Sequence, residues 1–421
     1  MSFREFLWRA GLSGPLLLGA GLSGYLVRIL YARCLPPKEV GLFYALFDFF
    51  MLLSLVRNLG LPQAVVKTLP ELEAQGRREE AAGLLRQLSR LLAAESLLLC
   101  LILFFLAPSL LRAYLPPESL PRALPAFRAL LGAFFLKAPL DLFREALRGL
   151  QRYVAYQLVG CLSISLVLLA SLGLCLLPGL ASVYLPVTAY TLAYLGALSV
   201  AWWLLRPSLP RARRNINLPR GFLSSALTLM LGSAGLSVLG FLDGVCLAHL
   251  GSLPEVAFYR NAAWPAATIL LYPASAFITA IFPYMAKLRA EEKRGELKGT
   301  VARAYLTVLA LSLPFSLLFA LWARPILSLL FGPAYAVAAR TFGLLSLGML
   351  PFNASLLGFA ILNGLGHLRL SAGLVYLGLL LDLLGNALLI PKLGGLGAAW
   401  ATVTALFVVS FLQGYVLWQR V

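Results

Sequence analysis

Basic side chains interrupt several stretches of this sequence that are otherwise apolar. Arg28 lies in AGLSGYLVRILYAR (20–33), Lys137 lies in FFLKAPLDLFREALRG, and Arg260 is followed one turn later by Trp264. A cation near the centre of a membrane-spanning helix costs about 2.5–3.5 kcal/mol on insertion scales, so each needs a partner or a wet environment. Guanidinium groups can hold phosphate oxygens bidentately. A cation beside an indole therefore suits an anionic ligand such as a sugar diphosphate.

Each basic residue also has a purely structural interpretation. Arg28 shares its helical face with Gly21 and Gly24, a small face that favours a cavity over lipid, yet its side chain could also reach the interface by snorkelling. Arg57 stands near one end of the second apolar stretch, where positive charge is ordinary. Arg260 and Trp264 could equally form an interfacial anchor. Both interpretations stay open for each residue.

Acidic residues inside the apolar stretches predict pairing or ion binding. Lys137 lies one turn before Asp141, so the two can neutralise each other, and structural pairing and substrate contact are equally consistent with the spacing. Asp243 suits a proton or sodium site in a coupled transporter, the alternative being packing against a basic neighbour. Pro265 and Pro273 interrupt the stretch that begins near Arg260 and are candidate hinges.

The composition explains why these charges matter. Sixty per cent of the 421 residues are hydrophobic, and apolar runs of about twenty residues recur along the whole chain, as crossing a bilayer requires. We expect an all-α integral membrane protein, because helices satisfy their backbone groups internally in lipid. The 35 Lys and Arg against 17 Asp and Glu fall mostly in short connections, which indicates membrane topology and not a nucleic-acid partner.

About twelve membrane-spanning helices are predicted, and the distribution of Lys and Arg places both termini in the cytoplasm. This arrangement predicts a multi-pass protein of a bacterial-type cytoplasmic (inner) membrane. The predicted spans are approximately 11–33, 40–61, 91–114, 124–148, 156–177, 181–205, 222–250, 256–285, 304–330, 335–365, 370–390 and 396–418.

The two halves of the sequence resemble each other. AGLS occurs at 20–23 and at 234–237, LRGL (147–150) matches LNGL (362–365), and further matched segments keep the same order. Six spans per half make the repeats parallel, so we predict two six-helix lobes related by a pseudo-twofold axis along the membrane normal, with a shared central cavity. The predicted division is an N-terminal lobe (1–205), a basic cytoplasmic linker (206–221) and a C-terminal lobe (222–421).

Cysteine and histidine spacing predicts no metal site. The five cysteines lie singly in or beside spans and are interpreted as packing residues, and the two histidines have no partner at metal-ligand spacing. The connecting loops are short and carry no cluster of acids or histidines. We therefore expect no cofactor and no enzymatic activity, which argues against a membrane glycosyltransferase or polymerase.

Four segments resemble one known family. They are NALLIPKLGGLGAAWATV (386–403), ARCLPPKEVGLFYALF (32–47), LRGLQRY (147–153) and FLDGVCLAHLGSLPEVAFYRNA (241–262). In these segments the chain resembles Wzx-type polysaccharide flippases of the multidrug/oligosaccharidyl-lipid/polysaccharide (MOP) superfamily, whose fold is MATE-like. The likeness covers nearly the whole chain.

The resemblance implies movement of an isoprenoid-diphosphate-linked oligosaccharide between leaflets, in contact with membrane lipids and with a proton or sodium as the candidate coupling ion. It also implies that arginines of the first, second and eighth spans line the cavity, at Arg28, Arg57 and Arg260. The alternatives are a cation-coupled multidrug extruder of the same superfamily and a lipid II flippase. Lipid II flippases usually have fourteen spans, which favours a polysaccharide repeat unit as the cargo.

Overall fold

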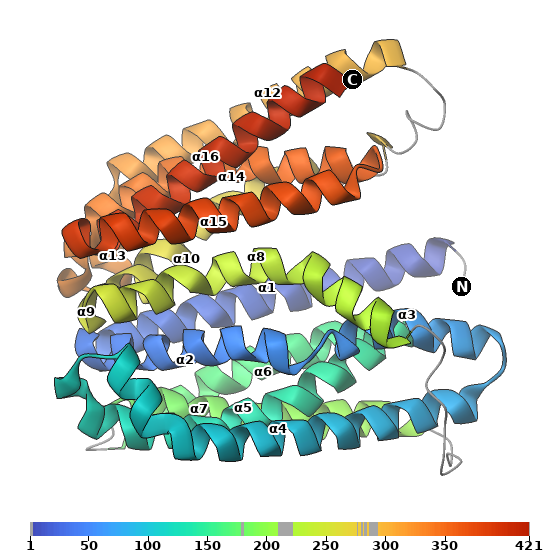
Figure 1. Ribbon diagram of the computed structural model, residues 1–421, viewed down its shortest axis with the longest axis horizontal. Helices are drawn as coiled ribbons and strands as arrows, with labels where there is room; N and C mark the ends of the chain where they lie inside the picture. Colours follow the sequence, from blue (N-terminus) through green and yellow to red (C-terminus); the bar gives the residue numbers. More distant parts are fainter. Residues whose placement is uncertain are drawn as a thin grey trace. The chain divides into compact units, whose positions relative to one another are not determined.

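The computed structural model is helical, and it describes residues 3–177, 181–208, 222–275, 277–278, 281, 284–285 and 294–420 (Figure 1). The chain divides into two compact units, Met1–Ala234 and Gly235–Val421, called unit 1 and unit 2 below. The predicted all-α class is confirmed. Residues 209–221 of the predicted linker lie outside the described residues, and the predicted boundaries at 205 and 222 stay a prediction.

Unit 1 is built mainly from long helices that pack in pairs. Its strongest packing partners are α1 with α6, α6 with α7, and α5 with α7 and α4. Its elements are α1 (Phe3–Cys34), α2 (Pro37–Arg57), α3 (Leu61–Ala74), α4 (Arg78–Tyr114), η1 (Pro117–Ser119), α5 (Leu120–Gly149), α6 (Tyr153–Cys175), α7 (Tyr184–Leu205) and η2 (Arg206–Ser208).

Unit 2 combines long helices with one irregular helical passage. The helix α8 (Phe222–Leu250) begins in unit 1 and continues into unit 2. The other elements are α9 (Leu253–Val256), the π-helical η3 (Ala257–Ala263), α10 (Trp264–Thr268), η4 (Ile269–Leu271), α12 (Arg294–Leu321), α13 (Ala323–Phe331), η5 (Pro333–Ala338), α14 (Ala339–Gly364), α15 (Leu368–Leu393) and α16 (Gly395–Arg420). Within it, α16 packs on α15 and α14, and α14 packs on α12.

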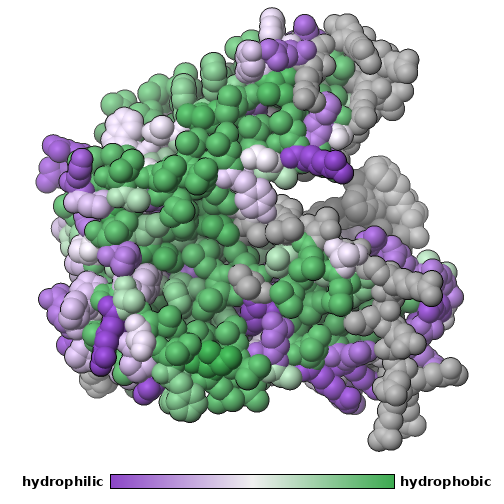
Figure 2. Space-filling view, viewed as in Figure 1, coloured by the Kyte–Doolittle hydropathy of each residue, from purple (hydrophilic) through white to green (hydrophobic). Residues whose placement is uncertain are grey.

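The helices are long and apolar enough to cross a bilayer repeatedly. Among the described residues, nine helical segments have the length and hydropathy of a span, from Gly14–Cys34 to Gly395–Gln419. Large apolar side chains such as Leu98 and Phe105 are exposed on α4, and apolar residues cover much of the visible surface (Figure 2). The protein is a multi-pass membrane protein. The exact count of twelve spans stays a prediction.

The duplicated sequence motif recurs as a duplicated helix end. After α5 and after α14 the chain turns through a left-handed residue, Gln151 (φ 56°) in unit 1 and Gly366 (φ 79°) in unit 2. In both turns the following amide, of Arg152 or of His367, donates to the carbonyl five positions earlier, at 2.9 and 2.8 Å. This is the Schellman arrangement, which satisfies the last carbonyls of a helix. LRGLQR and LNGLGH thus make the same local structure.

Candidate functional site

A buried acidic centre lies inside unit 2. Asp243 of α8 is 3% exposed, and three side chains from other elements donate hydrogen bonds to its carboxylate. The Tyr259 hydroxyl of η3 lies 2.5 Å and the Thr402 hydroxyl of α16 lies 2.9 Å from Oδ2, while the Asn386 amide of α15 lies 2.8 Å from Oδ1. None of these partners is basic. Four elements far apart in the sequence therefore converge on one carboxylate.

A second acid, Asp382, belongs to the same centre. It lies one turn before Asn386 on α15, is completely buried, and stands beside Asp243 and Thr402. Neither of its carboxyl oxygens has a hydrogen-bond partner of acceptable geometry among the described residues, and the same holds for Oδ1 of Asn386. Buried polar atoms are almost always partnered in folded proteins. The three oxygens are therefore unsatisfied acceptors at one place.

Two adjacent buried carboxyl groups are unstable when both are charged, unless a cation or a proton is shared between them. The oxygen atoms that could bind a cation here belong to two carboxyl groups, the amide of Asn386 and the hydroxyl of Thr402, and all of them are hard ligands. Within the described residues no three His, Cys, Asp or Glu side chains converge, so a transition-metal site is not indicated. The centre suits a monovalent cation or a proton.

Arg260 and Trp264 lie on the irregular passage next to this centre. Arg260 is inside the π-helical η3, is 5% exposed, and has its guanidinium carbon 5.6 Å from the centroid of the Phe241 ring. The Trp264 indole stacks on Tyr259 at 6.2 Å and 17°. Pro265 is the second residue of α10, directly after the π turn. Short π segments often mark functional positions in helices.

Unit 1 gathers its basic residues around aromatic rings. Arg28 of α1 is half-buried and lies 5.1 Å from the centroid of Tyr44 on α2. Phe43 connects this pair to Tyr190 of α7, with ring centroids 5.4 Å apart, and the next ring along α7 is Tyr194 at 5.7 Å. Tyr residues four positions apart share one helical face. A row of aromatic rings thus crosses the unit.

Lys137 stands at the other end of this row. Its ammonium lies 5.9 Å from the Tyr194 centroid and 2.8 Å from a carboxylate oxygen of Asp141, and both side chains of the ion pair are about one fifth exposed. The pairing considered from sequence is therefore present. Asp141 neutralises the charge of Lys137, and because both groups keep some exposure, the Lys137 ammonium stays accessible.

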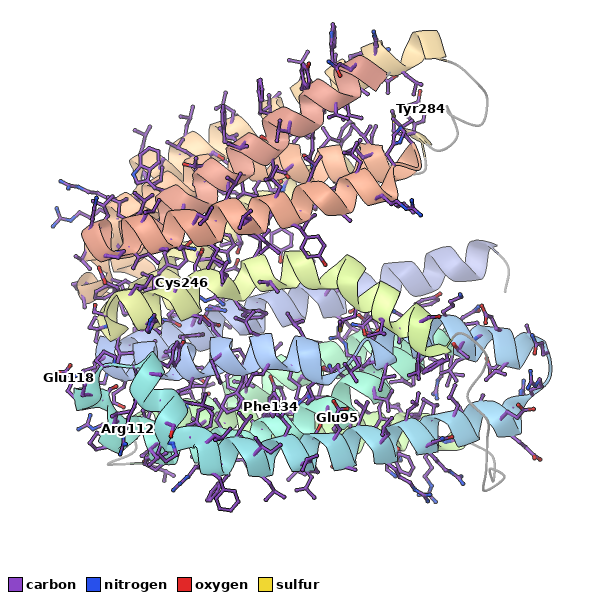
Figure 3. All side chains as sticks on the ribbon, viewed as in Figure 1. Glu95, Arg112, Glu118, Phe134, Cys246 and Tyr284 are labelled. Atoms are coloured by element: carbon purple, nitrogen blue, oxygen red, sulfur yellow. The ribbon has the colours of Figure 1, made fainter. Side chains whose placement is uncertain are left out.

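Arg57 occupies the interior of unit 1 and is 2% exposed. Its Nε donates to the side chain of Asn58, its Nη1 donates to the carbonyl oxygen of Phe134, and its guanidinium lies 4.2 Å from the centroid of the Phe134 ring. Phe134, which belongs to α5, is labelled in Figure 3. Its Nη2 is buried and has no hydrogen-bond partner among the described residues. Asp141 and Glu95 act on it only as attractive charges. One donor therefore remains for an added acceptor.

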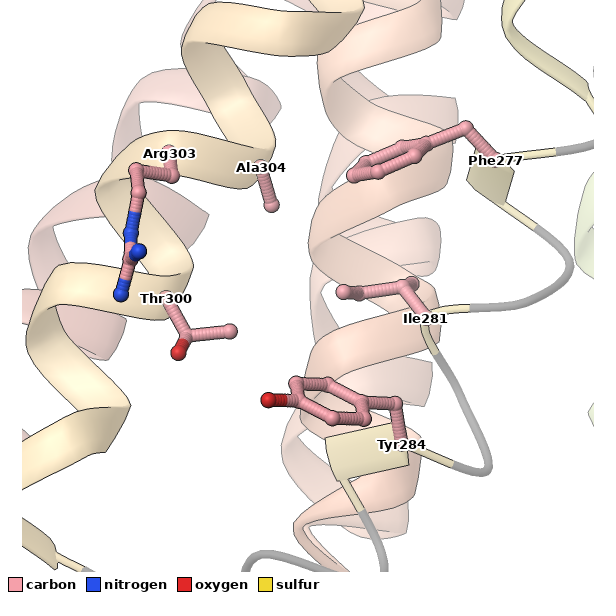
Figure 4. A pocket seen from close by; sticks show the side chains of 6 residues that line it. All are labelled: Phe277, Ile281, Tyr284, Thr300, Arg303 and Ala304. Atoms are coloured by element: carbon pink, nitrogen blue, oxygen red, sulfur yellow. The ribbon is translucent and has the colours of Figure 1, made fainter.

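A separate cavity of about 430 Å³ lies in unit 2 beside α12 (Figure 4). It is lined by Phe277, Ile281, Tyr284, Thr300, Arg303 and Ala304. The lining is mostly apolar, with the guanidinium of Arg303 on one side and the hydroxyl of Tyr284 on the other. None of the described residues that line it belongs to the acidic centre.

The comparisons with known proteins identify the family. The family model described as polysaccharide biosynthesis protein matches residues 16–289, more than half of the chain, and the MatE model matches residues 229–388. The chain belongs to the polysaccharide biosynthesis protein family. An uncharacterized membrane protein of Methanocaldococcus jannaschii is 31% identical over 430 residues, covering 98% of this chain and 84% of that protein.

Solved structures give the fold of this family member. A MATE family multidrug resistance transporter of the MOP superfamily, in an inward-facing conformation, matches with a TM-score of 0.80 at 16% identity, over 95% of this chain and 94% of that one. The lipid II flippase MurJ, inward closed, matches with a TM-score of 0.77 at 11% identity, over 96% and 87%. The predicted two-lobe MATE-like fold is confirmed.

Sequence reasoning selected part of the acidic centre of unit 2 and missed the rest. Asp243 was a candidate, whereas Tyr259, Asn386 and Thr402 were not assigned to its surroundings. The separations of 16, 143 and 159 positions explain why spacing gave no sign of the contacts. For Tyr190 and Tyr194 a signal existed, because their spacing of four residues places two phenols on one helical face.

Proposed function

We propose that this MOP-superfamily transporter moves a polyprenyl-diphosphate-linked oligosaccharide from the cytoplasmic to the outer leaflet by alternating access. We place it in the cytoplasmic membrane with both termini inside. The observation that carries the proposal is the set of basic groups in unit 1, in which Nη2 of Arg57 has no partner among the described residues and the Lys137 ammonium is accessible. A diphosphate supplies acceptors for such donors.

In the proposed mechanism the basic residues bind the headgroup and the aromatic residues bind sugar rings. Arg28, Arg57, Lys137 and Arg260 provide positive charge, and Trp264 provides a stacking face. Burial strengthens each contact, because a partly desolvated charge is screened less by water and salt. The prenyl chain stays among membrane lipids. Pro265 and Pro273 act as hinges. Pro265 lies next to the π turn, which already departs from α-helical hydrogen bonding, and Pro273 follows the 3₁₀ turn η4.

The acidic centre provides the coupling in this proposal. Asp382 and Asn386 offer unsatisfied oxygens beside Asp243, and a bound cation, sodium or a proton, neutralises the two carboxyl groups. Cation binding and release then shift the balance between inward-open and outward-open states, because a ligand favours the state that it binds more tightly. Binding of the coupling ion can be measured on the purified protein without the cargo.

The test is transport in proteoliposomes with a lipid-linked oligosaccharide whose sugar is accessible to an added enzyme only in the outer leaflet. We expect Arg28→Ala and Lys137→Met to slow flipping at least tenfold. The exposed arginines Arg112 and Arg340 provide matched controls, and their alanine variants are expected to flip at the wild-type rate. Unchanged flipping by both Arg28→Ala and Lys137→Met would contradict the proposed binding role.

A multidrug extruder is the second candidate, and the buried acids of unit 2 are the observation that favours it. Acidic and aromatic groups suit cationic amphiphiles. The same proteoliposomes separate the possibilities when they are given a cationic dye, lipid II and the oligosaccharide lipid in turn. We expect movement of the oligosaccharide lipid only. Movement of the dye alone would establish extrusion, and movement of lipid II alone would establish the peptidoglycan precursor as cargo.

A further inference from the structure

Two helices of unit 1 lie side by side and run in the same direction. The hydroxyls of Ser23 on α1 and Ser165 on α6 are 3.0 Å apart, and further along both helices the hydroxyls of Tyr31 and Ser171 are 2.9 Å apart. The sequence separations are 142 and 140 residues, so the register hardly changes over two turns. Only parallel helices can pair residues in this way.

The next turn of both helices brings two cysteines together. Cys34 follows Tyr31 by three positions and Cys175 follows Ser171 by four, so the same register pairs them. Cys34 is also the residue whose thiol interacts most with the thiol of Cys175. Cys34 is exposed and Cys175 is partly exposed. The sequence-based interpretation of both residues as packing cysteines stays a prediction, and both are free thiols in the structure.

Both cysteines are also the last residues of their helices. The helix α1 ends at Cys34 and α6 ends at Cys175. Helix ends adjust more easily than helix interiors, so the small shift that a disulfide requires between two Cβ atoms meets little resistance. The distribution of Lys and Arg places these two ends on the outer side of the membrane, where disulfides persist.

We propose that Cys34 and Cys175 form an intramolecular disulfide that joins the outer ends of α1 and α6. Two thiols lose two protons and two electrons, and one S–S bond forms. The oxidant is the disulfide of a thiol–disulfide oxidoreductase on the outer side, which is itself reduced to two thiols by exchange through a mixed disulfide. This inference rests on the proposed orientation and not on the cargo.

The other cysteines have different surroundings. The Cys100 thiol lies 3.7 Å from the carbonyl oxygen of Leu131, and the Cys161 thiol lies 3.9 Å from the hydroxyl of Ser165. Cys246 belongs to α8 in unit 2. Among the described residues, the pair at the ends of α1 and α6 is the one placed for a bridge.

A bridge here constrains the helix that carries Arg28. That residue lies less than two turns before Cys34 on the same helix, so a fixed helix end limits the positions open to its guanidinium. A crosslink that closes a loop of roughly 140 residues also removes much freedom from the unfolded chain. We therefore expect the oxidised protein to melt several degrees above the reduced protein.

The test uses full-length protein in membranes of the expressing cells. Cells are harvested into N-ethylmaleimide, the protein is purified without reductant, and peptides are analysed by mass spectrometry before and after reduction. We expect a linked peptide that contains Cys34 and Cys175, which disappears on reduction. Cys175→Ser is expected to abolish the linked peptide and to make Cys34 reactive toward a membrane-impermeant maleimide in intact cells. Cys161→Ser is the matched control and keeps the bridge.

Several outcomes would overturn the proposal. If N-ethylmaleimide modifies both Cys34 and Cys175 in most wild-type molecules, the two residues are free thiols and no disulfide is present. Linkage of either residue to another cysteine, or to a second chain, also contradicts it. Reaction of Cys34 in the Cys175→Ser variant only after the membrane is permeabilised places the pair on the inner side. The wild-type measurement needs no variant to fold, and its result does not depend on whether oligosaccharide flipping is observed.

Discussion

At the scale of single residues, the two buried acids of unit 2 differ in how their oxygens are satisfied. Asp243 accepts hydrogen bonds from three side chains, whereas Asp382 accepts none among the described residues. A carboxylate held by three donors is fixed in position. A carboxyl without donors is costly when charged, unless a cation is bound. Asp382 is therefore the more responsive member of the pair.

Cation binding at this centre predicts a cation-dependent melting temperature. A ligand that binds only the folded state adds about 2.7 kcal/mol of stability at 100 times its Kd. We expect sodium to raise the Tm of the purified wild-type protein by several degrees above that in choline, and Asp243→Asn and Asp382→Asn to lose this increase. A Tm that follows pH but not sodium identifies the cation as a proton.

The control for this measurement is Glu118→Gln, which removes an exposed carboxylate paired with Lys38. Its Tm is expected to keep the full dependence on sodium. A wild-type Tm that is the same in sodium, potassium and choline and at every pH tested would contradict cation binding at Asp243 and Asp382.

Single residues were predictable from the sequence where their type is unusual for its surroundings. Charges in apolar stretches, such as Arg28, Lys137 and Asp243, stand out because burying them is costly. Asn386 and Thr402 do not stand out, since small polar residues are common in membrane helices. Their role depends on three helices meeting at one carboxylate, and local spacing contains no information about that.

At the scale of elements, the two matching helix ends predict opposite effects of one exchange. Gln151 and Gly366 hold the same left-handed position, which costs a residue with a Cβ about 1–2 kcal/mol. We expect Gln151→Gly to raise the Tm and Gly366→Gln to lower it, each by an amount that corresponds to about 1 kcal/mol. Both positions are exposed, so side-chain packing contributes little.

The comparison is made by thermal unfolding in one detergent at fixed protein concentration. Gly373→Ala provides a control within α15, because its φ is not positive and an added Cβ would meet nothing within 4 Å. That variant is expected to be as stable as the wild type or slightly more stable. Changes of the same sign for Gln151→Gly and Gly366→Gln would contradict the assignment of equivalent turns.

Most helices were predictable, because apolar runs of about twenty residues leave few alternatives in a bilayer. The irregular passage from Ala257 to Leu271 was not. The passage changes from π to α to 3₁₀ hydrogen bonding while its residues stay mostly apolar. The spacing of hydrophobic residues in the sequence therefore does not indicate the change. Pro265 and Pro273 indicated only that regular helix would be interrupted nearby.

At the scale of the whole molecule, the asymmetry of Lys and Arg predicts that both termini face the cytoplasm. We expect a green fluorescent protein fused after Val421 to be fluorescent and an alkaline phosphatase fused there to be inactive, because each folds on only one side of the membrane. The opposite pair of results would reverse the orientation. It would also place Cys34 and Cys175 on the reducing side.

The sequence was also sufficient to predict duplication, because segments such as LRGL and LNGL recur in the same order. The exact division of the chain is a different matter. The helix α8 passes from unit 1 into unit 2 without interruption. The basic linker in the sequence ends at residue 221, whereas the two compact units divide after Ala234, inside α8. A boundary defined by charge need not coincide with one defined by contacts.

The parallel pairing of α1 with α6 has a consequence for biosynthesis. The hydroxyl groups of Ser23 and Tyr31 receive their partners, Ser165 and Ser171, only after the ribosome has added roughly 140 further residues. Until then the hydroxyl groups of Ser23 and Tyr31 on the inserted first helix lack their partners from α6. A chain that stalls before α6 is inserted should therefore present its first helix to membrane quality-control proteases as an orphan segment.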